Sequence, residues 1–203
     1  MARRTKAEAE RTCRLILEAS VDVFSEKGYS HTTFEDIAQR IGMTKGAVYW
    51  HYKNKAALVA ALFDTLNARE NLLLAASVPE INSLDDLYAS LVARIWVATK
   101  DEQCRKLAFF VSEQMEWSAH VLESVQEESK KYGTKPFEEV GEVLRKAMCG
   151  GLLRANTDTD AARDILISMY LGILTSHFQG ISNNDPVEMA EQAFQILIQG
   201  LKA

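Results

Sequence analysis

One short stretch of the chain, TKGAVYWHYKNK, brings together side chains that can bind nucleic-acid bases and phosphates. Lys45 supplies a cation that can donate hydrogen bonds to a guanine edge, and Tyr49 carries a phenol that can reach a phosphate or a thymine methyl group. Between them, Gly46 and Ala47 are small enough to allow a close approach to DNA. The set suits the major groove, where such groups distinguish base pairs.

Two short helices must hold these side chains in place. Thr33 and Asp36 have the spacing of a capping box, which opens a helix, and Gly42 can take the left-handed backbone that ends it. Thr44 can cap a second helix, whose Val48 then points back at the first. This order indicates a helix-turn-helix, although ordinary helical hairpins share the pattern.

Other residues near this motif have less certain roles. Trp50 and Tyr52 are expected to wedge the second helix onto its scaffold, as large aromatic side chains commonly do. Arg3, Arg4 and Lys6 form a basic arm at the start of the chain. Two interpretations of the arm stay open: a frayed, solvated terminus, or contacts with phosphates or a minor groove.

The net charge is unevenly distributed along the sequence. The 203 residues include 23 Lys and Arg against 28 Asp and Glu, a net charge of −5. Residues 1–60 hold ten basic and seven acidic side chains, a balance of +3, whereas residues 61–203 hold 13 and 21, a balance of −8. The division predicts a basic head that binds DNA and an acidic body that limits non-specific binding.

Composition and periodicity predict an all-α fold. The chain has three prolines and ten glycines, and few β-branched runs are bounded by turn residues. Gly28 is expected to end the first helix, and Asn54 to cap the one that follows the motif. Beyond the motif, apolar residues at helical spacing predict helices at about 7–27, 55–76, 84–96, 107–117, 118–149 with an interruption near 133–136, 160–179 and 186–201.

Several classes of protein are disfavoured. No apolar run is long enough to span a membrane, and the charged N-terminus lacks the apolar stretch of a signal peptide, which together predict a cytoplasmic protein without membrane contact. Cys13, Cys104 and Cys149 are too widely spaced for a disulfide framework or a zinc motif. Buried, inert thiols are expected, with redox sensing as the open alternative.

The sequence offers no catalytic arrangement. It contains no Ser/His/Asp signature, no glycine-rich phosphate loop and no HExxH motif, so neither an enzyme nor a cofactor is predicted. Glu113, Glu116 and His120 share one helical face, but no cysteine or second histidine completes a metal site. A solvated acidic face is the favoured interpretation, and no metal is expected.

Two stretches of the sequence carry a family resemblance. GMTKGAVYWHYKNKAAL is similar to the recognition-helix signature of TetR-family transcriptional repressors, and MARRTKAEAERT followed by VFSEKGY resembles the AcrR-type branch, which controls multidrug efflux pumps. The likeness is dense over about the first 63 residues and returns at Leu153–Phe178. It implies a three-helix helix-turn-helix DNA-binding domain at 1–54, a helical ligand-binding and dimerisation domain at 55–203, and about nine helices in all.

The resemblance also assigns roles within the motif. It implies that Lys45, Gly46 and Ala47 lie against base edges. The residues that it implies contact the phosphate backbone are Thr33, Tyr49, His51 and Lys55. The predicted DNA-binding residues are Thr33, Thr44, Lys45, Gly46, Ala47, Tyr49, His51 and Lys55.

The last two helices are apolar on more than one side, so each needs two packing partners. They can fill the interior of one subunit or, as the resemblance implies, pair with their mates in a homodimer that binds a palindromic operator. Gly172 and Ser176 are small enough for close crossing. The predicted dimerisation residues are Ile165, Met169, Gly172, Ser176, Ala193, Ile196 and Leu197.

Aromatic side chains with a few polar ones among them mark the middle of the chain. They can simply form the core, or they can line an apolar pocket with convergent polar groups, which is typical of a small-molecule site. The predicted ligand-binding residues are Phe63, Leu66, Glu70, Trp96, Phe109, Phe110, Glu113, Gln114, Trp117, Phe137, Ile173 and His177.

The mechanism that the resemblance implies is ligand-controlled repression of an efflux operon. The recognition helices of the dimer would lie about 34–36 Å apart, and a lipophilic or aromatic inducer would tilt the helix at 55–76 and disturb that spacing. Three alternatives stay open: a sensor of acyl-CoA, bile acid or another lipid-like metabolite, a DNA-binding regulator controlled by a protein partner, and a helical enzyme or carrier with a fortuitous helix-turn-helix.

Overall fold

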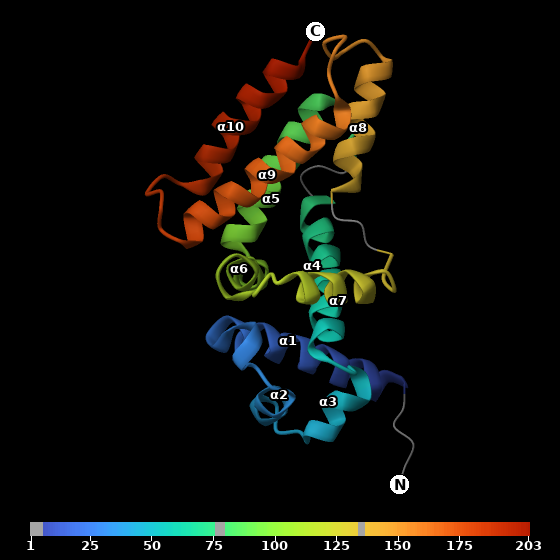
Figure 1. The fold of residues 1–203 in the computed structure, drawn as a ribbon, viewed down its shortest axis with the longest axis vertical. Coiled ribbons are helices and arrows are strands. Elements are labelled where there is room, and N and C mark those ends of the chain that lie inside the picture. Colours follow the sequence, from blue (N-terminus) through green and yellow to red (C-terminus); the bar gives the residue numbers. More distant parts are fainter. Residues whose placement is uncertain (1–5, 76–79, 134–136) are drawn as a thin grey trace. The chain divides into compact units, whose positions relative to one another are not determined.

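The chain folds into two compact helical units. The computed structural model describes residues 6–75, 80–133 and 137–203, and every named element within them is helical (Figure 1). Unit 1 comprises Met1–Asn67 and Phe109–Thr134, and unit 2 comprises Ala68–Ala108 and Lys135–Ala203. The division falls inside one long helix, α4, so unit 1 is built from two separate stretches of sequence.

Unit 1 contains the proposed helix-turn-helix. Its helix α2 packs on both α1 and α3, and the short π-helix η1 packs on α1. Figure 1 shows α2 and α3 lying next to each other beside α1. The elements are α1 (Lys6–His31), α2 (Phe34–Arg40), α3 (Lys45–His51), the first part of α4 (Lys55–Ala75), η1 (Phe110–Gln114) and α7 (Ala119–Ser129).

The end of α1 is shaped to receive η1. Gly28 has φ 77° and ψ 172°, so it interrupts α1 where the sequence predicts a helix end, although helical turns resume as far as His31. A Cβ atom on Gly28 would lie 3.0 Å from Gln114 Oε1. Nearby, the fully buried ring of Phe110 stacks on Phe24 of α1 with centroids 4.9 Å apart. The segment that begins at Phe109 therefore completes the core of unit 1.

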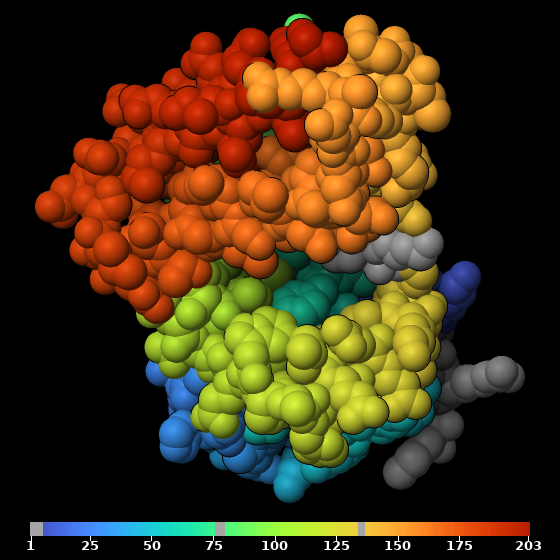
Figure 2. Space-filling view, turned by 45° about the horizontal axis from the view of Figure 1, so that its top comes forward, coloured from blue at the N-terminus to red at the C-terminus, as the bar shows by residue number. Residues whose placement is uncertain are grey.

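Unit 2 is a helical cluster around α5, which contacts α8, α9 and α10. Capping residues start two of its helices: Ser83 forms a capping box with Asp86 at α5, and Asp185 caps α10 ahead of Pro186. In the space-filling view α9 and α10 form one continuous surface (Figure 2). Besides the end of α4, the elements are α5 (Leu84–Lys100), α6 (Glu102–Phe109), α8 (Glu138–Cys149), α9 (Thr159–Phe178) and α10 (Pro186–Leu201).

The all-α prediction is confirmed, with ten α-helices and one π-helix in the described residues rather than about nine helices. The predicted helix at 107–117 is wrong, because α6 already begins at Glu102 and passes into η1. Asp101 explains the early start: it ends α5, and its carboxylate accepts a hydrogen bond from the Cys104 N–H at 3.1 Å. The predicted interruption near 133–136 falls largely outside the described residues.

Helix length and hydropathy also bear on membranes. Of the helices in the described ranges, none combines the length and the apolar character that crossing a bilayer requires.

Replacing Gly28 by alanine tests the packing of η1 on α1. We expect Gly28→Ala to lower the free energy of unfolding by about 1–2 kcal/mol, because an alanine is strained at positive φ, with a further loss from the contact with Gln114. Urea unfolding followed by circular dichroism measures the change. Gly200→Ala is the matched control, since Gly200 is helical with open space around it and should be neutral or slightly stabilised.

Candidate DNA-binding interface

The local signals of the helix-turn-helix are confirmed in the structure. At the start of α2, the Thr33 N–H donates to Asp36 Oδ2 at 2.8 Å, and the Asp36 N–H donates to Thr33 Oγ1 at 3.2 Å. Gly42 has φ 65° in the turn, and Thr44 Oγ1 accepts a hydrogen bond from the Ala47 N–H at 3.3 Å. Both short helices are therefore fixed at their N-terminal ends, where free N–H groups would otherwise remain.

The outer face of α3 presents two of the three predicted base-reading residues to solvent, and the third, Ala47, is partly buried. Lys45 and Gly46 are exposed, and Tyr49 is 51% exposed, whereas Val48 is fully buried against the scaffold. The Tyr49 ring packs edge-to-face on Phe34 of α2, with centroids 4.8 Å apart. Phe34 was not singled out by the sequence reasoning, yet it fixes the orientation of the Tyr49 phenol.

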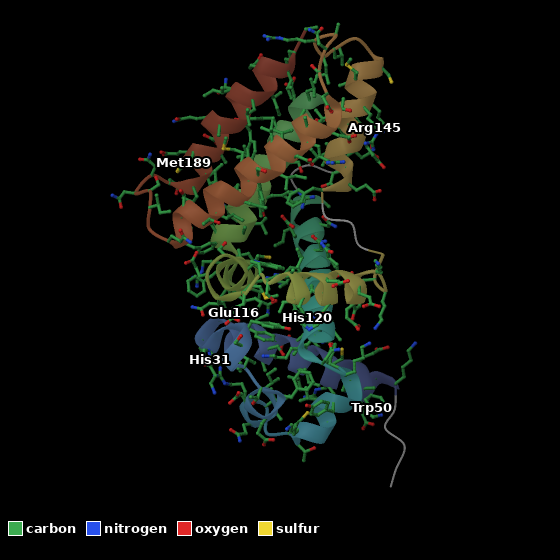
Figure 3. All side chains as sticks on the ribbon, in the orientation of Figure 1. His31, Trp50, Glu116, His120, Arg145 and Met189 are labelled. Atoms are coloured by element: carbon green, nitrogen blue, oxygen red, sulfur yellow. The ribbon has the colours of Figure 1, made fainter. Side chains whose placement is uncertain are left out.

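The two aromatic residues expected to wedge α3 behave differently. Tyr52 is buried and its hydroxyl lies 3.0 Å from Cys13 Sγ on α1; burial raises the pKa of Tyr52. Trp50 is 71% exposed and points away from the core (Figure 3), so its predicted role is wrong. The reason is helical spacing: Val48 and Tyr52 are four residues apart and share the buried face, which leaves Trp50 on the opposite side.

Two predicted phosphate contacts lie at the turn that follows α3. His51 is partly buried, and its ring lies 4.6 Å from that of Trp50. Lys55 Nζ donates to the carbonyl oxygens of Tyr29 at 2.6 Å and Ser30 at 3.2 Å, and partial burial lowers its pKa. In this structure the Lys55 ammonium group binds the end of α1, so its contact with a phosphate stays a prediction.

Ion pairs between α1 and α2, which the sequence reasoning missed, orient the motif. Lys27 Nζ donates to Asp36 Oδ1 at 2.6 Å, and Arg40 binds Glu26 through both carboxylate oxygens. The hydrogen bond from Lys27, followed by those from Thr33, lowers the pKa of Asp36 to about 2. Pairs separated by 9 and 14 residues leave no helical-periodicity signal in the sequence.

We expect Asp36→Asn to destabilise unit 1 by about 1 kcal/mol at neutral pH, because it weakens the capping box and removes the partner of Lys27. The folded-state pKa lies below the unfolded value, so this contribution is complete above about pH 4 and is lost as the pH falls through 2. Urea unfolding of the wild type and the variant between pH 7 and pH 2 should show a difference that shrinks in acid. Glu35→Gln, an exposed neighbour in the first turn of α2, should show a smaller difference.

The predicted ligand-binding residues are divided between the two units. In unit 1, Phe110 and Leu66 are buried, whereas Trp117 is 45% exposed; in unit 2, Ile173 is buried and Trp96 is 52% exposed. Surface grooves are lined by residues of α1 and α2 and by residues of α5 and α10, and none of the predicted residues lines either groove. Unit 1 holds Phe63, Leu66, Phe109, Phe110, Glu113, Gln114 and Trp117, and unit 2 holds Glu70, Trp96, Phe137, Ile173 and His177.

A buried polar cluster surrounds one of these candidates in unit 2. The Arg94 guanidinium lies 3.1 Å from Glu70 and 2.6 Å from Glu139, and it covers the ring of Phe137, which packs edge-to-face on Tyr170. Burial raises the pKa of Glu70, against the opposing effect of Arg94. Glu70 Oε1 is buried and makes no hydrogen bond. The carboxylates of Glu70 and Glu139 thus share the Arg94 guanidinium, and Glu70 Oε1 can still accept a hydrogen bond.

The residues considered for a metal site and the cysteines have varied surroundings. Glu116 accepts a hydrogen bond from Ser30 Oγ at 2.5 Å, and His120 is exposed on α7 (Figure 3). The expectation of buried thiols holds for Cys104, whose pKa burial raises to about 12, and is wrong for Cys149, which is exposed.

Several of the predicted dimerisation residues form an exposed apolar face. Ile165 on α9 is 53% exposed and Ile196 on α10 is 72% exposed, and Met169 is also exposed. A Cβ atom on Gly172 would meet open space. The other three predicted residues are partly buried: Ser176, Ala193 and Leu197.

Comparison with known proteins agrees with this geometry. Residues 16–62 match the family model described as bacterial regulatory proteins, tetR family. The probable HTH-type transcriptional regulator ArpR of Pseudomonas putida is 47% identical over 87 residues, which span 43% of this chain and 41% of the relative. That likeness therefore covers well under half of the relative's length.

Two solved structures are similar over nearly the whole chain. NalD, the secondary repressor of the MexAB-OprM multidrug efflux pump in Pseudomonas aeruginosa, has a TM-score of 0.77 and 26% identity, covering 97% of this chain and 98% of NalD. SmeT in complex with triclosan has a TM-score of 0.77 and 27% identity, covering 95% and 92%. SmeT is the repressor of the multidrug efflux pump SmeDEF of Stenotrophomonas maltophilia.

A capped helix-turn-helix with an exposed second helix, joined to a helical body, defines the class of a helical DNA-binding regulator rather than an enzyme. Residues 16–62 carry the DNA-binding domain of the tetR family of bacterial regulatory proteins. Over nearly its whole length the chain is similar to repressors of multidrug efflux pumps.

Proposed function

We propose that this protein is a ligand-responsive repressor that binds an operator as a homodimer and controls a multidrug efflux operon. The observation that carries the proposal is the exposed face of α3, where Lys45, Gly46 and Tyr49 project from a helix that is capped by Thr44 and buried through Val48. A helix presented in this way can enter the major groove. Relatives that repress efflux pumps support the choice of target.

Lys45 is the residue proposed to read a base directly. We expect Lys45→Ala to cost about 1–3 kcal/mol of operator binding and to relax specificity at one base position. Selecting binding sites from random duplex DNA, with both proteins, measures the change in sequence preference. An equal loss on all sequences would show instead that Lys45 contacts a phosphate. Lys130→Ala, at the exposed residue that follows the end of α7, is the charge-matched control.

The polar cluster of unit 2 supports the proposed response to a small molecule. Glu70 Oε1 is a buried acceptor without a donor, and the Arg94 guanidinium that binds Glu70 also covers the ring of Phe137. A buried acceptor of this kind is costly unless a donor reaches it. The unit has 11 basic and 15 acidic side chains, a balance of −4, which favours neutral or cationic ligands over polyanions.

An operator-release experiment tests the ligand response. We expect triclosan or the lipophilic cation tetraphenylphosphonium to lower operator affinity at least tenfold, whereas stearoyl-CoA, a polyanion, has little effect. Fluorescence anisotropy of a labelled operator gives the affinity with and without each compound. Release by stearoyl-CoA alone would favour a lipid-metabolite sensor, and unchanged affinity with every compound would count against efflux control.

Dimerisation is proposed to occur through α9 and α10. The exposed side chains of Ile165, Met169 and Ile196 form apolar surface that a second copy of the chain would cover. A two-fold dimer would double the few base pairs that one α3 can read, which explains why a short helix suffices.

A further inference from the structure

The turn between α3 and α4 is anchored at four successive residues. The Tyr52 hydroxyl meets Cys13 on α1, Asn54 Oδ1 accepts the hydrogen bond that caps α4 at 2.7 Å, and Lys55 binds the end of α1. Lys53 reaches a different element, the helix α7. The partners of Tyr52, Asn54 and Lys55 lie within the first 67 residues. The partner of Lys53 comes from a part of the sequence far beyond the matched family model.

The partner of Lys53 is Glu128, and the two side chains have unequal freedom. Lys53 Nζ lies 2.7 Å from Glu128 Oε1, and the Glu128 side chain is only 9% exposed while that of Lys53 is 66% exposed. Lys131, in the turn just beyond the end of α7, donates to the other carboxylate oxygen of Glu128. The buried carboxylate is therefore also held by a residue next to it in the sequence, and the exposed Lys53 side chain extends toward it.

We propose that Glu128 is a positioning residue for DNA binding. By holding Lys53, it fixes the turn that joins the end of α3 to the start of α4, and with it the placement of the predicted phosphate contacts His51 and Lys55. Helix α7 then sets the geometry of the recognition helix directly, in addition to any effect of α4. This inference rests on the proposed DNA-binding function and adds a residue from outside the helix-turn-helix.

The ion pair also determines what Lys53 can do. While its ammonium group is bound to Glu128, Lys53 is neutralised and does not serve as a phosphate contact. Without the carboxylate, the same lysine becomes a mobile cation beside the DNA-binding turn, and mobile cations strengthen binding to any sequence. Loss of Glu128 should therefore reduce operator affinity and raise non-specific affinity at the same time.

The test measures operator and non-specific affinities over a range of salt concentrations. We expect Glu128→Gln to bind the operator about tenfold more weakly, with a non-specific salt slope steeper by up to about one. Lys53→Gln should lose about the same operator affinity without the steeper slope. Because the two residues act as one pair, the double variant should lose no more than either single variant.

A matched control separates this role from general destabilisation. Glu123→Gln removes the same charge from an exposed position on α7 and should leave both affinities unchanged. Thermal unfolding by circular dichroism checks that each variant is folded, and a purely structural loss would lower operator and non-specific binding in parallel. Such a parallel loss in Glu128→Gln overturns the inference, as does additive loss in the double variant.

Two further outcomes are decisive. If Lys53→Gln makes the wild-type salt slope shallower by about one, Lys53 is itself a phosphate contact and the positioning role is wrong. If the wild type selects no operator from random DNA, the proposed function fails; if it selects one and Glu128→Gln binds it equally well, only the present inference fails.

Discussion

A helix of seven residues is not stable in water, and the proposed DNA-reading face of this protein lies on such a helix. Its conformation must therefore come from its surroundings. Thr44 accepts a hydrogen bond from one N–H group of its first turn, Val48 is buried beneath its centre, and Tyr52 is buried just beyond its end. The outward side chains of α3 have a fixed direction because Thr44 caps the helix and the side chains of Val48 and Tyr52 point into the core.

The same requirement extends beyond the motif. The neighbouring helix α2 is equally short, and ion pairs from Lys27 and Glu26 hold it to α1. The end of α1 is in turn packed against η1, where Phe110 stacks on Phe24. The short helices of the motif are thus held by α1, and α1 is in turn packed against η1. Part of this packing comes from residues more than 40 positions beyond the matched family model.

Features set by neighbouring residues could be predicted from the sequence. The capping box at Thr33, the left-handed Gly42 and the start of α10 at Pro186 follow from local backbone requirements, and the structure confirms all three. The predicted packing of Trp50 on the scaffold is wrong, because it rested on the size of the aromatic side chain and not on the position of Trp50 on the helix.

Features that depend on distant packing could not be predicted. The pairing of Arg94 with Glu70 and Glu139 joins α5 to α4 and α8, and neither helical periodicity nor spacing indicates which carboxylate meets which guanidinium. The same holds for Lys53 and Glu128, which are 75 residues apart and whose pairing depends on how α7 packs within unit 1. The caps and the buried Val48 of the helix-turn-helix could therefore be predicted from the sequence, whereas the long-range ion pairs that support it could not.

The discontinuity of unit 1 has a consequence for synthesis. A nascent chain that ends near Asn67 contains the complete helix-turn-helix but lacks η1 and α7, so one face of Phe24 has no stacking partner and Lys53 has no carboxylate to bind. The unit can reach its final packing only after residue 134 has left the ribosome, by which time the first part of unit 2 has also been made. The packing around the proposed DNA-binding face is thus completed late in translation, although the residues predicted to contact DNA are translated first.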